Sequence, residues 1–321
     1  VLYYLNALTE YRTLHPTDHS FDTELQRALQ QVLVDFAHYN VPKGWLYFYL
    51  LRDAILLQNN DLFADTYAIA ANYYNNWYNP QFGLVYNRNA NDYTVEHTLA
   101  CGTALIDAGQ RWGKPAWIAA GQSTLNNALV HAFNQHYRLF YHSMAVAADG
   151  SQTVEDDLAK ATSQGMDAET LVNAYVLTHN QFYLVLAGIV LQTLLNGPLW
   201  DRAYGGLFFA FHLTTGKVEQ AYKETRGQSA TLIALYRYNQ LFSQMGRSAP
   251  FIGQQEQLTS LLSANFYQST YHGFFYRVTP TFQVYTSSPG QGIGYEDFFT
   301  TEAMGVSMDA LQQTEFATIP L

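Results

Sequence analysis

The chain has 321 residues and a net charge of −10, with 13% charged residues and 16% aromatic residues. This length is sufficient for a large core in one domain spanning residues 1–321. The negative charge excludes nucleic acid as a partner, because phosphate binding needs a basic surface. The sequence also has no basic cluster of the kind that binds an anionic membrane surface.

The first part of the chain predicts a series of helices. Residues 2–14 form the first, which ends before Pro16. Apolar residues at helical spacing from Phe21 to Phe36 predict the second. Residues 45–57 are apolar nearly all round, which is typical of a helix buried on several sides. Asp61 caps a further helix that carries an aromatic stripe.

A repeated unit then follows, built from a turn, an aromatic strand, a polar excursion and a helix. Its copies begin at Asn79, Asn134, Asp201 and Gln268, which are 55, 67 and 67 residues apart. In the clearest copy, residues 201–238, two glycines allow the turn and a helix starts near Thr225. A repeat of this length indicates a repeat architecture.

The helices pair as outer and inner members. The pairs start near residues 21 and 45, 61 and 95, 116 and 167, 180 and 225, and 251 and 297, and helix 2–14 remains to close a ring of six. We therefore expect an all-α fold, an (α/α)6 toroid with short β-hairpins on its loop face. The alternative is an open α-solenoid. All long loops fall on the side where inner helices begin, which is where function is expected.

Carboxylates and aromatic residues gather at these inner-helix starts. Sugar hydrolysis needs two carboxyl groups, one to protonate the glycosidic oxygen and one to attack the sugar or activate water. We expect Asp156 and Asp157 to be this pair, with Glu96 and Asp297 as the alternative pair. The predicted sugar-binding residues are Trp45, His97, Tyr204, Lys223, Arg226, Gln228, Tyr295 and Phe298.

Each candidate also has a structural interpretation. Acids near helix starts are favoured as caps and by the helix dipole. Asp156 and Asp157 are alternatively part of a solvated acidic loop. Trp45 lies on a helix that is apolar all round, so packing explains it equally well. Arg226 could pair with Glu224 or Asp297.

No cofactor and no metal site are expected. The ten histidines form no metal-binding pattern, although clustered acidic residues could bind Ca²⁺. Cys101 is the single cysteine, which excludes an intrachain disulfide, and its apolar neighbours predict burial.

The most apolar window, residues 182–195, is too short to span a bilayer. The chain starts at Val1 without a signal peptide, as a mature form would, so a secreted or cell-surface location is favoured over a cytoplasmic one.

The run Asp201, Tyr204-Gly205-Gly206, Gly216, Lys223 and Arg226-Gly227-Gln228 resembles a pattern in the N-acylglucosamine and cellobiose 2-epimerases. The resemblance implies the six-hairpin glycosidase type of (α/α)6 barrel. Epimerases of this type carry catalytic histidines at inner-helix starts, where this chain has only His97.

The chain is also similar to glycoside hydrolase family 76, whose signature is two adjacent aspartates on the cavity side of the barrel. Asp156-Asp157 could match that signature. We therefore expect a glycoside hydrolase acting on an oligosaccharide or polysaccharide. The alternatives are a sugar 2-epimerase that uses His97 and a non-catalytic glycan-binding protein.

Overall fold

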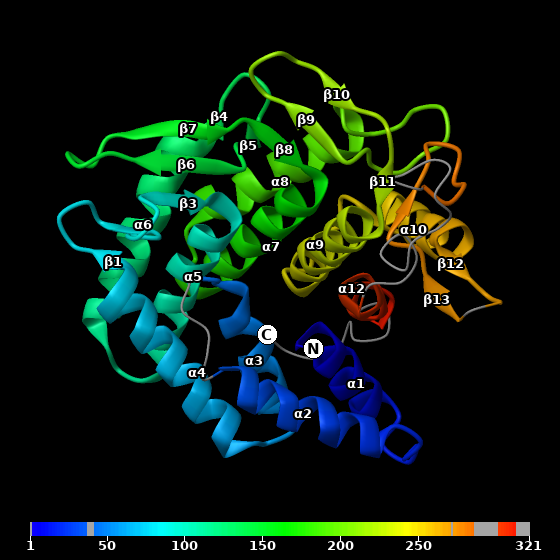
Figure 1. Cartoon of the computed structure of the whole chain (residues 1–321), viewed down its shortest axis with the longest axis horizontal. Coiled ribbons are helices and arrows are strands. Elements are labelled where there is room, and N and C mark those ends of the chain that lie inside the picture. The colour runs from blue at the N-terminus through cyan, green and yellow to red at the C-terminus, as the bar shows by residue number, and fades with distance from the viewer. Residues whose placement is uncertain (1, 37–41, 271, 286–300, 313–321) are drawn as a thin grey trace.

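The computed structural model describes residues 2–36, 42–270, 272–285 and 301–312. Six of its helices form an inner ring, in which each helix packs against the next (Figure 1). They are α1 (Leu2–Leu14), α3 (Trp45–Leu56), α5 (Val95–Arg111), α7 (Ala161–Thr178), α9 (Thr225–Gln244) and α12 (Thr301–Gln312). The contact between α12 and α1 closes the ring. The predicted toroid is confirmed and the open solenoid is excluded.

Five further helices in the described part of the chain cover this ring from outside. Each packs against the inner helix with which it forms a hairpin: α2 (Asp22–Phe36) on α1, α4 (Asn60–Asn72) on α3, α6 (Pro115–Ala132) on α5, α8 (Gln181–Asn196) on α7 and α10 (Ile252–Leu261) on α9. The sequence predicted that each outer helix pairs with the inner helix that follows it, but in the structure each outer helix packs mainly on the inner helix that precedes it. The helix predicted from about Asp167 begins earlier, at Ala161, because a strand leads directly into it. The other predicted start, Asp297, lies outside the described residues.

Two glycines let neighbouring inner helices approach closely. A Cβ atom on Gly44, just before α3, would collide with the backbone nitrogen of Cys101 on α5. A Cβ on Gly165 of α7 would lie 2.7 Å from the backbone nitrogen of Thr231 on α9. Any larger residue at either position would push the helices apart. Cys101 is fully buried, as predicted.

The repeated unit is confirmed as a tight turn between two short paired segments. The pairs are Tyr78 with Val85 (β1, Tyr78–Asn79; β2, Leu84–Val85), Phe133 with Phe140 (β4, Phe133–Asn134; β5, Leu139–Phe140), Tyr267 with Phe274 (β12, Tyr267–Gln268; β13, Gly273–Phe274), and an isolated bridge between Trp200 and Leu207. Equivalent turn residues have a positive φ: Gly83 at 61°, Arg138 at 58°, Gly205 at 79° and His272 at 50°. The common backbone explains the glycines in this unit.

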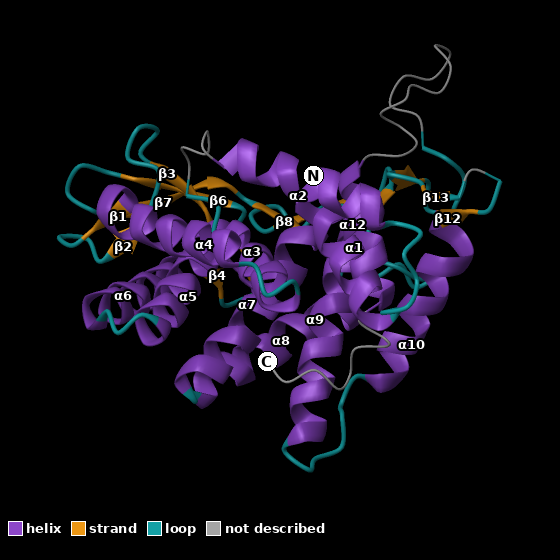
Figure 2. Cartoon of the chain, turned by 90° about the horizontal axis from the view of Figure 1, so that it is seen from below, coloured by secondary structure: helices purple, strands orange, loops and turns teal. Residues whose placement is uncertain are grey.

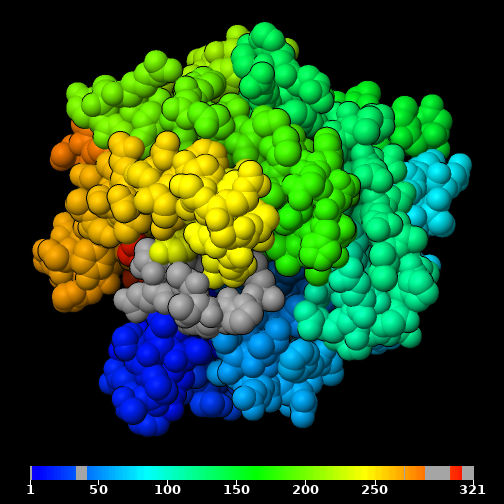
Figure 3. All heavy atoms as spheres, turned by 180° about the vertical axis from the view of Figure 1, so that it is seen from behind, coloured from blue at the N-terminus to red at the C-terminus, as the bar shows by residue number. Residues whose placement is uncertain are grey.

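Further strands lead into the inner helices on the loop face. One antiparallel sheet has the order β3-β6-β7 and another the order β10-β9-β8, and β11 pairs with β14. Their bounds are Asp92–Thr94 (β3), Ser143–Val146 (β6), Gln152–Asp156 (β7), Leu158–Lys160 (β8), Ala210–His212 (β9), Val218–Glu219 (β10), Lys223–Glu224 (β11) and Arg277–Val278 (β14). Figure 2 shows these strands gathered on one side of the helices. Figure 3 shows the opposite face, where the turn between α9 and α10 (yellow) protrudes.

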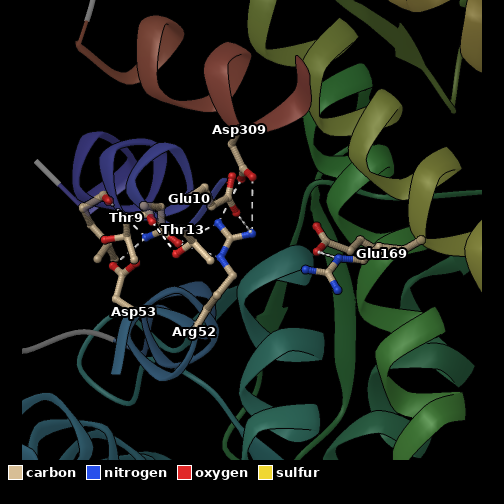
Figure 4. Close-up of polar contacts among 10 residues, drawn as sticks. Thr9, Glu10, Thr13, Arg52, Asp53, Glu169 and Asp309 are labelled. Atoms are coloured by element: carbon tan, nitrogen blue, oxygen red, sulfur yellow. Dashed lines mark hydrogen bonds and ion pairs between the residues drawn. The ribbon is translucent and has the colours of Figure 1, made fainter. Parts of the chain in front are cut away.

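A group of buried charged and polar side chains lies where α1, α3 and α12 meet (Figure 4). The Arg52 guanidinium is 2.6 Å from Glu10 and 3.2 Å from Asp309, and it donates to the Asn6 side-chain oxygen at 2.6 and 2.9 Å. Asn6 in turn donates to Asp53 at 3.1 Å. We call Asn6, Glu10, Arg52, Asp53 and Asp309 the closure cluster. It joins the first, second and last helices of the inner ring.

No helix in the described ranges is both long enough and apolar enough to cross a bilayer.

Candidate active site

A cavity of about 780 Å³ opens among the first turns of the inner helices. The residues that line it come from all six inner helices and from the strands before them, and they include Tyr3, Lys43, Trp45, Tyr49, Glu96, His97, His142, Lys160, Ser163, Met166, Glu169, Phe209, Glu224, Arg226 and Val306. This size is typical of a small-molecule site. Four predicted site residues lie together here: Trp45, Glu96, His97 and Arg226.

The loop-face strands hold the starts of three inner helices. Val95 donates its backbone N–H to the carbonyl of His142 at 2.9 Å, Ala161 to that of Phe209 at 3.0 Å, and Thr225 to that of Tyr276 at 3.1 Å. None of these helices has a side-chain N-cap. Because backbone carbonyls accept from the first N–H of each helix, the side chains beside them are left for the cavity.

Glu96 and His97 extend from the first turn of α5 into the cavity. The Glu96 Oε1 atom is 3.9 Å from His97 Nε2. Glu96 Oε2 and His97 Nδ1 are buried and have no hydrogen-bond partner among the described residues. Burial lowers the pKa of His97, and the Glu96 charge opposes that shift. Buried polar atoms without partners at a cavity wall are groups that a polar ligand could satisfy.

Asp167 lies behind this wall on α7 and is fully buried. Neither carboxylate oxygen has a hydrogen-bond partner within the described ranges. Burial raises the pKa of Asp167 well above its usual range, and the negative charge of Glu96 raises it further. Burial therefore disfavours a negative charge on Asp167 beside Glu96.

His142 is a cavity residue that was not predicted from the sequence. Its Nδ1 atom is 3.5 Å from the Ser163 hydroxyl. Burial lowers its pKa, and so does the nearby Lys160 charge. The repeat contained a signal for it, since His142, Phe209 and Tyr276 each come two residues after the paired aromatic or apolar residues Phe140, Leu207 and Phe274.

Two other cavity carboxylates are bound by arginine. Arg277 donates through Nε and Nη2 to Glu224 Oε1 at 3.1 and 3.0 Å, and Arg226 lies 3.8 Å from Glu224 Oε2. Glu169 pairs with Arg237 at 2.7 Å. Burial raises the pKa of Glu169, and Arg237 opposes that shift. Glu96 has no arginine or lysine within ion-pair distance in the described part of the chain, so the three carboxylates differ in electrostatic environment.

Trp45 forms part of the cavity wall from the first residue of α3. Its ring packs beside those of Phe48 and Tyr49, at centroid distances of 6.3 and 6.1 Å. Its Nε1–H is buried without a hydrogen-bond acceptor among the described side chains and backbone. Trp45 therefore serves packing and also leaves a donor for a ligand at the cavity.

Lys223, Gln228 and Tyr204 do not line the cavity, so their predicted role in sugar binding stays a prediction. Lys223 is fully buried, pairs with Asp201 at 2.8 Å and donates to the carbonyls of Gly205 and Pro280. Burial lowers its pKa, and Asp201 opposes that shift. These contacts hold the turn of the repeated unit together.

Gln228 holds the same unit from the helix side. Its amide exchanges two 2.8 Å hydrogen bonds with the backbone of Leu207. Gln164 binds the backbone of Phe140 in the same way, at 2.8 and 2.9 Å. Both glutamines are fourth in their helices, so Gln228 is part of the repeated scaffold. Tyr204 lies on the turn and is 55% exposed.

Asp156 and Asp157 also lie outside the cavity lining. Asp156 accepts from the Leu158 backbone at 3.0 Å and is 3.7 Å from Lys160. Asp157 accepts from the Thr214 backbone at 3.0 Å and pairs with His212 at 3.0 Å. Burial favours a raised pKa for Asp157, but the bonds from His212 and Thr214 outweigh it and lower the pKa. These contacts join two loop-face sheets, so the catalytic role of this pair stays a prediction.

Tyr295, Asp297 and Phe298 lie outside the described residues. Within the described ranges, no group of three or more histidine, cysteine, aspartate or glutamate side chains is arranged to hold a metal ion.

No protein-family model matches the sequence, and no curated protein matches it closely enough to count as a relative. Solved structures do match the fold. An unsaturated glucuronyl hydrolase from Bacillus sp. GL1, responsible for the degradation of glycosaminoglycan, has a TM-score of 0.73 at 13% identity, over 98% of this chain and 86% of that one. A family 76 α-mannanase from Bacteroides thetaiotaomicron has a TM-score of 0.68 at 12% identity, over 99% and 86%.

A cellobiose 2-epimerase from Spirochaeta thermophila has a TM-score of 0.54 at 17% identity, over 68% of this chain and 57% of that one. All three are six-hairpin (α/α)6 toroids. The chain therefore has the fold of the six-hairpin glycosidase superfamily, as the resemblance implied.

Proposed function

We propose that the protein is a glycoside hydrolase that binds an oligosaccharide or polysaccharide end in the central cavity, with Glu96 as its proton donor. The observation that supports this most directly is the meeting of Glu96, His97, Arg226 and Trp45 in one cavity at the inner-helix starts. The enzymes with a similar fold, an unsaturated glucuronyl hydrolase and an α-mannanase, also act on sugar chains.

The reaction would use carboxyl groups in two different environments. Glu96 would give its proton to the glycosidic oxygen as the bond from that oxygen to the anomeric carbon breaks. Water would add to the anomeric carbon, and its proton would return to Glu96, which the first step leaves as a carboxylate. Glu224, which accepts two hydrogen bonds from Arg277, would stabilise the positive charge that develops on the sugar ring. The predicted partner of Glu96, Asp297, is an alternative for this second role.

The test replaces Glu96 by glutamine, which keeps the shape of the side chain and removes its proton chemistry. Wild type is screened against unsaturated glucuronyl disaccharides, α-manno-oligosaccharides and cello-oligosaccharides. On the cleaved substrate, we expect Glu96→Gln to lower kcat by about 10²- to 10⁴-fold and to leave binding, measured by calorimetry, nearly unchanged.

Glu155→Gln is the matched control, because Glu155 binds Ser143 at 2.9 Å on the loop face and does not line the cavity. Equal activity of Glu96→Gln and Glu155→Gln would reject Glu96 as the proton donor. A wild type that cleaves nothing in the screen would contradict the hydrolase proposal.

Sugar 2-epimerisation is the second candidate, and one observation favours it. His97 and His142 lie in the same cavity, and burial lowers the pKa of both. Neutral imidazoles can take a proton from one face of a sugar and return it to the other. Epimerisation would give a product without hydrolysis and would incorporate solvent deuterium at C2, which mass spectrometry of the product detects.

A further inference from the structure

A row of partly exposed aromatic side chains leads away from the cavity. Phe209 lines the cavity, the Tyr222 ring lies 4.9 Å from it, and the Tyr285 ring lies 4.9 Å further on. All three side chains are half-buried, whereas most large aromatic rings of the core are fully covered. The row thus connects the cavity to the loop face without a break.

A guanidinium group belongs to the same row. Arg277 lies over the ring of Tyr222 at 4.5 Å and over that of Tyr276 at 4.6 Å. Its hydrogen bonds to Glu224 use Nε and Nη2, which leaves Nη1 to donate to a ligand. Burial raises the pKa of Tyr222 to about 12, so its phenol remains a neutral donor. We call Phe209, Tyr222, Tyr276, Arg277 and Tyr285 the rim cluster.

Backbone hydrogen bonds fix the positions of these side chains. Phe209 donates to the carbonyl of Tyr222 at 3.2 Å, and Tyr285 donates to that of Arg277 at 3.2 Å. Tyr276 accepts from the first residue of α9. Since the rim cluster is already ordered, a ligand would bind to it with little loss of conformational entropy.

We propose that the rim cluster is a second subsite, which binds the sugar residues of the substrate beyond those held in the cavity. Aromatic rings present flat apolar surfaces to the apolar faces of pyranose rings, and Arg277 with the tyrosine hydroxyls offers hydrogen bonds to sugar hydroxyl groups. This inference rests on the proposed function. It adds that the substrate is an oligosaccharide of at least three units.

The test compares substrate lengths, because a distal subsite acts only on chains that reach it. We measure kcat/KM for the di-, tri- and tetrasaccharides of the series that the wild type cleaves, using Tyr222→Ala, Tyr285→Ala and Tyr222→Phe. The two alanine variants should lower kcat/KM about ten-fold on the longer chains and leave the disaccharide within about two-fold. Tyr222→Phe keeps the ring and removes only the hydroxyl, so on the longer chains it should lose less than Tyr222→Ala.

Tyr267→Ala is the matched control, because Tyr267 is a partly exposed tyrosine on β12 that packs on Phe274 and lies outside the rim cluster. Tyr285→Ala keeps the test valid if Tyr222→Ala does not fold, as judged by its melting temperature. Equal losses on all substrate lengths would overturn the inference, since the rings would then only support Phe209 in the cavity wall. No loss on any length would also overturn it.

A wild type that cleaves no series would reject the proposed function and leave the subsite open to a separate measurement. Calorimetry with the same oligosaccharides would then compare wild type and Tyr285→Ala. Affinity that rises with chain length in the wild type only would support the subsite. Affinity independent of chain length in both would reject it.

Discussion

The first turns of the inner helices and the turns that follow them carry two different arrangements of charge. At the first turns, Glu96, His97 and Trp45 hold buried polar atoms without partners among the described residues. At the second and third turns, Arg52 binds Glu10, Asp309 and Asn6 across three helices. The same ring therefore uses charge for closure at one depth and leaves it available at the other. The proposed site is therefore distinguished by its cavity and not by the number of charged groups.

The largest effect on stability should come from breaking the closure cluster. Arg52→Met leaves Glu10 and Asp309 buried without their cation, so we expect the free energy of unfolding to fall by about 3–5 kcal/mol. Urea denaturation followed by circular dichroism measures it. Arg12→Met is the control, because Arg12 pairs with Asp22 at the surface, where such a pair contributes about 1 kcal/mol or less. Equal losses in the two variants would show that the closure cluster has no special role.

The pH dependence of stability tests the same cluster, with a smaller expected change in the free energy of unfolding. Burial raises the pKa values of Glu10 and Asp53 above their usual range, and Arg52 opposes both shifts. The folded state then binds more protons than the unfolded chain. The stability that these extra protons contribute is fully present below the ordinary carboxyl pKa of about 4. It is lost as pH rises through the pKa that each group has in the folded protein. We expect the free energy of unfolding to fall as pH rises above about 4.

Glu10→Gln cannot ionise, so it should reduce the slope of stability against pH in that range. Asp149→Asn provides the opposite case. Hydrogen bonds from the hydroxyl and backbone N–H of Ser151 lower the pKa of Asp149, so its contribution is present above its ordinary pKa and lost as pH falls. The slope above about pH 5 should therefore be unchanged in Asp149→Asn. An unchanged slope in Glu10→Gln would contradict the assignment.

The smallest effect should come from Asp157→Asn. The structure ties Asp157 to His212 and Thr214 outside the cavity lining, so we expect turnover within about two-fold of wild type and a slightly lower melting temperature. The catalytic assignment made from the sequence requires the reverse. Loss of turnover at an unchanged melting temperature would restore Asp157 as a catalytic residue and would move the site away from Glu96.

The toroid could be predicted because its two signals, the helical stripes and the aromatic repeat, depend on short stretches of sequence. The start of α7 was misplaced by the polar residues Thr162, Ser163 and Gln164, which hide its first turn. Those residues are polar because they face the cavity or bind a neighbouring strand. Local pattern therefore fails where a helix begins at a site.

The site could be predicted only in part. Glu96, His97, Arg226 and Trp45 lie in the cavity because each belongs to the first turn of an inner helix. Gln228 has the same location along the chain, yet its side chain faces a strand. Residue spacing alone does not tell whether a side chain in the first turn faces the cavity or a strand. The matching Gln164 in another repeat nevertheless indicated a structural role for Gln228.

The backbone bonds that hold the inner-helix starts limit how this protein can be redesigned. His142, Phe209 and Tyr276 each supply a carbonyl to the helix of the preceding unit. A loop transplanted from another toroid would have to deliver that carbonyl at the same place, whatever its length elsewhere. The polar tip at residues 147–151 is free of this requirement. Insertions and new binding loops should be tolerated at such tips and rejected two residues beyond each aromatic strand.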